Sequence, residues 1–275
     1  MNKLFRVVFL VTTAATLVSA GSAKAAIVGY VGTSDGIISQ VNLETGEATP
    51  LVNTALDEAL GDIAISNTGV VYANSLSAEG GNNFVYKVNV FSKKVTPIGD
   101  ANANNLAGLA FNTDSDQLFG SSFAQGSNPG SFYSLDTSTG LATLIAQIPN
   151  FSAAGDIAYN PNTKTFFATS TTPTNSTLFS IALDGTAQEI GDIGFENVYG
   201  LIYTDNTLYG LTSDGQQLTL DTSTGVGTFK NDVTGLAADT QILGASPAAV
   251  PEPITILGSL TAIGFGVMKR KLASK

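Results

Sequence analysis

A short apolar segment that returns at nearly regular intervals constrains the fold more than any other feature of the sequence. Its clearest copy is Gly-Leu-Ala-Phe at residues 108–111, and the copies follow one another at intervals of 42 to 48 residues. They occupy residues 62–65, 108–111, 155–159, 200–203 and 241–244. A unit of this length cannot bury both of its faces alone, so the units must pack against one another.

Each unit is predicted to contain four short β-strands. A polar turn follows the first strand, and a second strand with a recurrent aromatic residue comes next; these aromatic residues, predicted to lie in the core, are Tyr72, Phe119, Phe167 and Tyr209. A hairpin closes the unit, with Leu-Asp-Thr-Ser-Thr-Gly at residues 135–140 and again at 220–225, and a looser copy at 41–49. Asp or Asn at the turn entry can accept main-chain hydrogen bonds, and Gly supplies the positive φ that the turn needs.

Four-stranded units of about 45 residues are typical of β-propeller blades. The body begins at residues 27–30 with a second strand that lacks its first, and it ends at 241–244 with a first strand that lacks its second. Joining the two ends gives one composite blade, which also covers otherwise exposed sheet edges. We therefore expect an all-β, five-bladed propeller over residues 26–246, with the small residues Gly108, Ala110, Ala158 and Gly200 on the innermost strands.

Two units depart from the hairpin pattern. Ser92 and Lys93 stand where the other units have Thr and Gly, which predicts a positive φ at Lys93 or a different turn. The hairpin at residues 183–186 is one residue shorter, which favours a two-residue Asp-Gly turn.

The composition excludes several classes of chemistry. The chain has no cysteine and no histidine, so thiol nucleophiles, disulfides, Ser-His-Asp triads and the commonest zinc ligands are all excluded. Between residues 26 and 250 it carries five basic and 21 acidic residues, and a surface this acidic repels nucleic acid and anionic lipid. We expect no cofactor.

Residues 1–25 have the pattern of a secretory signal peptide. Lys3 and Arg6 precede an apolar stretch, and Ala23 and Ala25 form a small-x-small cleavage site for signal peptidase. Export with cleavage before Ala26 is the expectation, with an uncleaved membrane anchor as the alternative.

The body resembles the WD40/YVTN-type propeller repeats. The resemblance rests on the Gly/Asp-Leu/Ile-Ala-Phe/Tyr strand, the Leu-Phe/Tyr-Ala/Gly strand and the Leu-Asp-x-x-Thr-Gly-x-x-Thr hairpin, and it covers about 220 residues. It implies the fold and says little about function, because propellers host enzymes, lectins and scaffolds alike.

The carboxy-terminal tail resembles a PEP-CTERM sorting signal. A linker with the Val-Pro-Glu-Pro motif at residues 247–253 precedes an apolar stretch within 254–275, and the basic residues Lys269, Arg270 and Lys271 follow that stretch. The resemblance implies that an exosortase acts on Pro251, Glu252 and Pro253 while the apolar helix holds the precursor in the membrane. The basic end would stay cytoplasmic and the body outside, at the cell surface or in the extracellular matrix. A permanent tail anchor is the alternative.

Two sets of oxygen ligands are candidates for chemistry. Asn112, Asp114 and Asp116 begin like a calcium-binding loop, but the Gly and the acidic residue that complete such a loop are missing, which favours a plain turn. Asp62 and Asp156 start two of the innermost strands, near one channel mouth. They are interpreted as bonding the main chain between blades, with a glycosidase carboxylate pair as the alternative.

The longest loops, at residues 77–83, 125–130 and 171–175, are polar and should gather on one rim, where binding sites on rigid scaffolds commonly lie. The sequence thus favours an exported, non-catalytic binding or structural module of the bacterial surface or matrix, with exopolysaccharide as a candidate ligand. A propeller glycosidase or lyase that uses Asp62 and Asp156 is the alternative.

Overall fold

The computed structural model describes residues 26–56, 59–76, 82–171 and 175–248. The predicted signal peptide with Ala23 and Ala25, the Pro-Glu-Pro motif, and the apolar segment with its basic end all lie outside these ranges. Within the ranges, no helix is long and apolar enough to cross a membrane.

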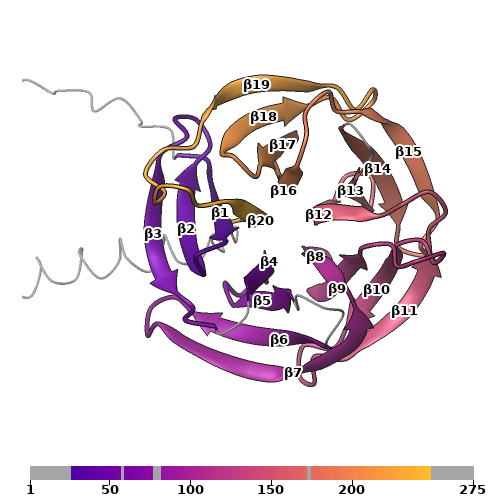
Figure 1. Ribbon diagram of the computed structural model, residues 1–275, viewed down its shortest axis with the longest axis horizontal. Coiled ribbons are helices and arrows are strands. Elements are labelled where there is room, and N and C mark those ends of the chain that lie inside the picture. The colour runs from indigo at the N-terminus through magenta and orange to yellow at the C-terminus, as the bar shows by residue number, and fades with distance from the viewer. Residues whose placement is uncertain (1–25, 57–58, 77–81, 172–174, 249–275) are drawn as a thin grey trace, which may run out of the picture.

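Five four-stranded antiparallel sheets stand around a central axis as the blades of a propeller (Figure 1). Blade 1 contains β20 (Ile242–Pro247), β1 (Val28–Thr33), β2 (Ile37–Asn42) and β3 (Ala48–Asn53). Blade 2 contains β4 (Ala59–Ile65), β5 (Val71–Leu76), β6 (Asn82–Asn89) and β7 (Lys94–Asn104). Blade 3 contains β8 (Leu106–Asn112), β9 (Gln117–Ser122), β10 (Ser131–Leu135) and β11 (Ala142–Gln147). Blade 4 contains β12 (Ala153–Asn160), β13 (Thr165–Thr171), β14 (Ser176–Ala182) and β15 (Ala187–Asp192). Blade 5 contains β16 (Val198–Thr204), β17 (Thr207–Thr212), β18 (Gln216–Leu220) and β19 (Gly227–Asp232).

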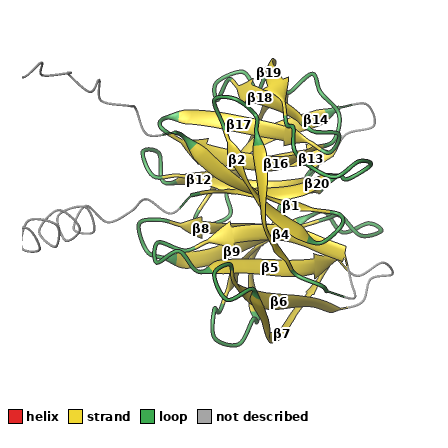
Figure 2. Cartoon of the chain, turned by 90° about the vertical axis from the view of Figure 1, so that its left-hand side faces the viewer, coloured by secondary structure: helices red, strands yellow, loops and turns green. Residues whose placement is uncertain are grey.

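The composite closing blade is confirmed. The innermost strand β20 pairs antiparallel with β1, with Gly29 opposite Pro247, so the two ends of the described chain lie at the same mouth of the channel (Figure 2). Blade 5 is tied to blade 1 through the Leu43 carbonyl, which accepts hydrogen bonds from Gln217 Nε2 at 2.8 Å and from Lys230 Nζ. Closure therefore rests on strand pairing and on side-chain bonds to the main chain.

The hydrophobic core is divided among the five interfaces between neighbouring blades. Each of five buried clusters draws its residues from two adjacent blades; the largest joins blades 3 and 4 around Phe119, Phe132 and Phe166. The recurrent aromatic residues of the second strands are all at most 6% exposed, which confirms their prediction as core. The core therefore forms between blades and not within a single blade, as expected for a repeat too short to bury both of its faces alone.

Small residues line the axis because the innermost strands crowd there. A Cβ atom on Gly108 would lie 2.6 Å from the carbonyl oxygen of Gly155, and one on Gly155 would lie 2.4 Å from that of Tyr199. Since real side chains do not approach main chain this closely, the glycines set the spacing of blades 3, 4 and 5 at the axis.

The Thr-Gly hairpins join the blades at the outer rim. Gly140 lies against Gly99 of β7 in the preceding blade, and Gly225 lies against Gly191 of β15 in the same way. The outermost strand of every blade has a register shift, and such bulges bend a strand away from its own sheet. The repeated hairpin sequence is therefore an interblade clasp as well as a turn.

The two hairpins that depart from the sequence pattern, in blades 2 and 4, have different turns. Lys93 has φ 55°, so it adopts the left-handed conformation that its sibling glycines adopt. The shorter hairpin in blade 4 has three residues between the bonded pair Ala182 and Thr186, with Gly185 at φ 84°. The prediction of a two-residue turn there was wrong, and the third residue, Gly185, lies against Ala146 of blade 3.

Candidate functional site at the central channel

Asp62 and Asp156 lie at the axis, and each is located at a β-bulge in the innermost strand of its blade. The pairing of β4 with β5 and of β12 with β13 shifts register at these residues, and such a bulge re-aims a side chain. Both side chains are completely buried. The structure thus brings the two sequence candidates together inside the channel, below its mouths.

The two carboxyl groups join all five innermost strands. Asp62, on β4, accepts hydrogen bonds from the main-chain N–H groups of Ile63 at 2.7 Å and, across the blade interface, of Leu109 on β8 at 2.6 Å. Asp156, on β12, accepts from Leu201 on β16 at 2.7 Å and from Ala245 on β20 at 3.0 Å, both through Oδ2. This is the interblade bonding that the sequence interpretation favoured.

Burial makes the ionised form of both carboxyl groups unfavourable. Desolvation raises the pKa of Asp62 to about 8, against the main-chain hydrogen bonds that lower it. Desolvation and the adjacent Asp62 charge raise the pKa of Asp156 well above its usual range. Two touching carboxylates cannot both stay ionised in such a site, so the pair retains a proton at neutral pH.

The position of that proton follows from the hydrogen bonds. Asp156 Oδ1 is buried and accepts no hydrogen bond from the described residues, while the Asp62 carboxyl is in hydrogen-bonding contact with the Asp156 carboxyl. Both Asp62 oxygens already accept main-chain hydrogen bonds. A proton on Asp156 Oδ1, donated to Asp62, gives every oxygen of the pair a partner.

The surrounding residues are shaped to hold this pair. A Cβ atom on Gly244 of β20 would lie 1.8 Å from Asp62 Oδ1, so only glycine fits there. Asn74 accepts a hydrogen bond from the Asp62 N–H at 2.7 Å and donates to the Leu106 carbonyl of blade 3, also at 2.7 Å. No sequence pattern marks Asn74 or Gly244 as partners of the pair, because their contact with Asp62 depends on the bulge in β4.

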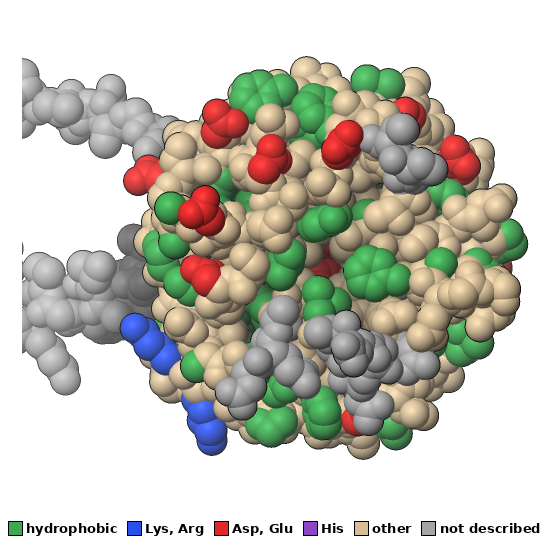
Figure 3. Space-filling model, in the orientation of Figure 1, with side chains coloured by type: hydrophobic (Ala, Val, Ile, Leu, Met, Phe, Trp, Pro, Cys, Tyr) green, Lys and Arg blue, Asp and Glu red, His purple; other side chains and the backbone are tan. Residues whose placement is uncertain are grey.

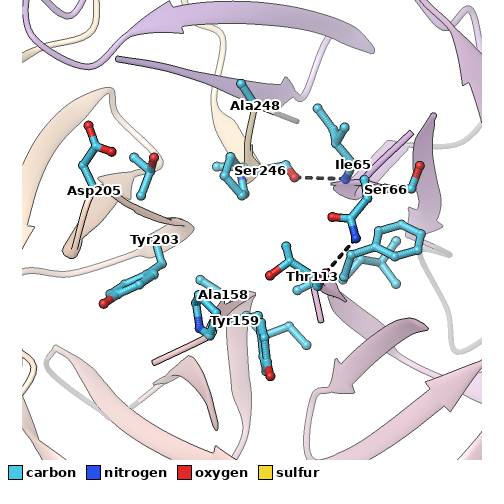
Figure 4. A pocket seen from close by; sticks show the side chains of 18 of the residues that line it. Ile65, Ser66, Thr113, Ala158, Tyr159, Tyr203, Asp205, Ser246 and Ala248 are labelled. Carbon is cyan, nitrogen blue, oxygen red and sulfur yellow. Dashed lines mark hydrogen bonds between the residues drawn. The ribbon is translucent and has the colours of Figure 1, made fainter. Parts of the chain in front are cut away.

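The channel opens on two sides of the pair. At the carboxyl ends of the innermost strands, a pocket of about 370 Å³ is lined by residues of all five blades (Figure 4). Its floor is apolar and buried, for example at Leu109, Ile157 and Ala245, whereas its rim includes the exposed residues Asn67 and Asn162. From sequence these rim residues are predicted to lie in turns, and the recurrence of a polar turn at the same place in each unit indicates that the turns meet at one rim.

The opposite mouth contains a pocket of about 250 Å³ lined mainly by apolar and small residues. Leu76, Phe123 and Thr171, which lie beside or at the start of the three long polar loops, line this pocket, so the described ends of those loops gather at one rim as expected. On the face shown in Figure 3, the acidic side chains lie mainly in the upper and left parts, and the visible basic side chains lie at the lower left edge.

The three calcium candidates, Asn112, Asp114 and Asp116, each accept a hydrogen bond from a different group. Asn112 Oδ1 accepts from the Asp114 N–H at 2.9 Å, Asp114 Oδ2 accepts from the Tyr159 hydroxyl at 2.9 Å, and Asp116 Oδ1 accepts from the Asn67 N–H at 2.9 Å. In the described part of the chain, no group of three or more acidic side chains could hold a metal ion together. These residues close a turn and bond the neighbouring blades.

Comparison with known proteins supports the fold. No protein-family model matches the chain, and no curated protein matches it significantly. Among solved structures, 592 chains match. One is a chain of a nidogen/laminin complex, with a TM-score of 0.53, 12% identity, and coverage of 80% of this chain and 84% of that one. Another is a gluconolactonase from Xanthomonas campestris, with a TM-score of 0.50, 11% identity, and coverage of 77% and 78%. At such identities the likeness shows a β-propeller fold and nothing more.

Proposed function

We propose that this chain is an exported, non-catalytic propeller that binds exopolysaccharide at the bacterial surface or in the extracellular matrix. The signal-peptide pattern and the PEP-CTERM-like tail support export and sorting, with signal peptidase and an exosortase as the processing enzymes. The proposal includes transient membrane attachment through the apolar tail before processing.

The observation that carries the non-catalytic part is the state of the axial carboxyl pair. Glycosidases need two carboxyl groups on either side of the scissile bond, about 5 to 10 Å apart, with access for the sugar. Asp62 and Asp156 are fully buried, contact one another and bond main chain from several blades. There is no room for a glycosidic bond between them.

The alternative is a propeller glycosidase or lyase in which this pair is catalytic. The solved structures of similar fold include both a nidogen/laminin complex and a gluconolactonase, so the fold does not choose between binding and catalysis. For catalysis here, the two carboxyl groups would have to separate and reach solvent, which would break the bonds that join the innermost strands.

The test uses the purified protein and exopolysaccharide from its own host. We expect the protein to co-sediment with the polymer without producing new reducing ends or unsaturated sugar products. The Asp156→Asn variant, which keeps the shape of the pair, should bind as the wild type does. Product formation that this variant abolishes would establish the enzyme instead, and absence of co-sedimentation would reject polysaccharide binding.

A further inference from the structure

We propose that the pocket at the carboxyl ends of the innermost strands is the ligand site of this module and takes a neutral saccharide unit. This inference rests on the proposed function and makes it specific: it names the mouth and the chemical class of the ligand. It places the site opposite the long loops, which are the binding candidates that sequence alone suggests.

The shape and lining of the pocket suit a ligand with an apolar face and polar edges. Its volume of about 370 Å³ lies in the range of small-molecule sites, which combine an apolar lining with a few placed polar groups. The floor is formed by buried aliphatic side chains, and the turns that follow the innermost strands of blades 2 to 5 supply a polar rim (Figure 4). A pyranose ring has this division, with C–H groups on its faces and hydroxyl groups around its edge.

The rim is organised by hydrogen bonds before any ligand arrives. Asn162 Nδ2 of blade 4 donates to Asn206 Oδ1 of blade 5 at 2.7 Å and to the Tyr203 hydroxyl at 3.3 Å. Across the pocket, Asn67 Nδ2 of blade 2 donates to the Thr113 carbonyl of blade 3 at 2.7 Å. Tyr203, which also lines the pocket, packs on Phe167 with ring centroids 5.9 Å apart. Such fixed groups lower the entropy cost of binding.

The charge of the lining decides between classes of saccharide. None of the residues that line the pocket is Lys or Arg, and the rim includes the carboxylate of Asp205. An acidic sugar would meet this carboxylate and the strongly acidic body without a cation to pair with. The lining therefore favours neutral sugars over uronic acids.

The opposite mouth is a poorer candidate. Its pocket is smaller, and the residues that line it are Gly, Ala, Leu, Phe, Thr and Tyr, so few side chains there can bond hydroxyl groups. Strand β16 contributes a tyrosine to each pocket. Tyr199, at its amino end, lines the smaller pocket, and Tyr203, near its carboxyl end, lines the larger one. This strand provides a matched pair of variants.

The experiment measures binding by titration calorimetry with the full-length protein and neutral oligosaccharides from partial hydrolysis of the host polysaccharide. Asn162→Ala and Tyr203→Phe should each weaken binding about 3- to 10-fold, the effect of one hydrogen bond. The matched variants on the opposite side are Asn128→Ala, in the polar loop at residues 125–130, and Tyr199→Phe, in the smaller pocket; both should leave affinity unchanged. Oligogalacturonate should not bind, and an amine-bearing chitosan oligomer should bind no better than neutral sugars.

The possible failures separate the two proposals. If neutral sugars bind but only the Asn128 and Tyr199 variants weaken them, the polysaccharide function stands and this site is wrong. If only oligogalacturonate or only the chitosan oligomer binds, the neutral class is wrong. If no saccharide binds while the polymer also fails to co-sediment, both proposals are rejected. Unchanged melting temperatures of the four variants ensure that lost affinity is not lost folding.

Discussion

Aspartates tie the blades together at the axis and shape the clasps at the rim, but their electrostatics are opposite. At the axis, burial raises the pKa of Asp62 to about 8, although main-chain N–H groups bond its carboxylate. At the rim, hydrogen bonds from Ser138 and Thr139 lower the pKa of the exposed Asp136 to about 2, and Asp221 behaves in the same way. Burial therefore keeps a proton on the axial pair, whereas the exposed rim carboxylates, with similar donors, stay ionised.

The opposite pKa shifts of these aspartates show which physical effect dominates at the axis and which at the outer rim. At the axis, desolvation outweighs the hydrogen bonds because the carboxyl groups have no contact with water. At the rim, solvent removes that penalty and the bonds decide. The fold should consequently be most stable at mildly acidic pH, where the axial pair keeps its proton and the rim carboxylates are ionised.

The largest predicted effect is loss of stability in alkaline solution. The pKa values of both axial carboxyl groups are raised on folding, that of Asp62 from 3.8 to about 8, so the folded pair binds its proton more tightly than the same groups do in the unfolded state. That contribution is complete below about pH 4 and is lost as pH rises through about 8. We expect the melting temperature to fall steadily between pH 5 and pH 9, measured by circular dichroism, with a shallower fall in Asp156→Asn.

The two axial substitutions should differ at pH 6, and this difference is the control. In Asp156→Asn, the amide can take the place of the protonated Oδ1 and donate to Asp62, while its oxygen still accepts from Leu201 and Ala245. In Asp62→Asn, one of the N–H groups of Ile63 and Leu109 faces an amide donor, at a cost of about 1–3 kcal/mol. Equal stability of the two variants would contradict the assigned proton position.

A smaller effect is expected from the rim clasp. Gly140 has φ 80°, and a Cβ atom there would lie 2.9 Å from the carbonyl oxygen of Gly99 in the preceding blade. Gly69 has nearly the same φ, 78°, with no atom within 4 Å of its Cβ position. Gly69→Ala should cost about 1 kcal/mol for the backbone conformation alone, and Gly140→Ala about 1 kcal/mol more because the clasp must move. Urea unfolding measures both, and equal costs would mean that the clasp contributes nothing.

Much of the fold followed from the repeat. The spacing of the innermost strands predicted five blades, and the unmatched segments at residues 27–30 and 241–244 predicted their closure. These features are periodic, so they are visible without knowledge of contacts. The two-residue turn predicted in blade 4 was wrong: the turn has three residues, and its Gly185 lies against Ala146 of blade 3, a contact that local sequence does not show.

The site was less accessible to sequence reasoning. The sequence placed Asp62 and Asp156 near one another, since both start innermost strands, but not their burial or mutual contact, which depend on bulges that have no clear sequence signature. The polar rim of the larger pocket has the composition of ordinary turns. Only the closed ring shows that Asn162 and Asn206, from different blades, meet at a hydrogen-bonding distance of 2.7 Å.

The smallest predicted effect concerns the rim carboxylates, and the chain supplies its own reference for it. Asn42 and Asn89 occupy the turn position of Asp136 in blades 1 and 2, where their Oδ1 atoms accept the same two main-chain hydrogen bonds. Asp136→Asn should therefore fold normally and lose only the charge.

Because the pKa of Asp136 is lowered to about 2, its contribution to the free energy of unfolding is present above about pH 4 and is lost as pH falls toward 2. The variant should be slightly less stable than the wild type at pH 6, and the gap should close by pH 2.5 in thermal melts. Asp221→Asn should repeat this result, and a gap that widened in acid would mean that the rim clasp does not depend on the ionised carboxylate.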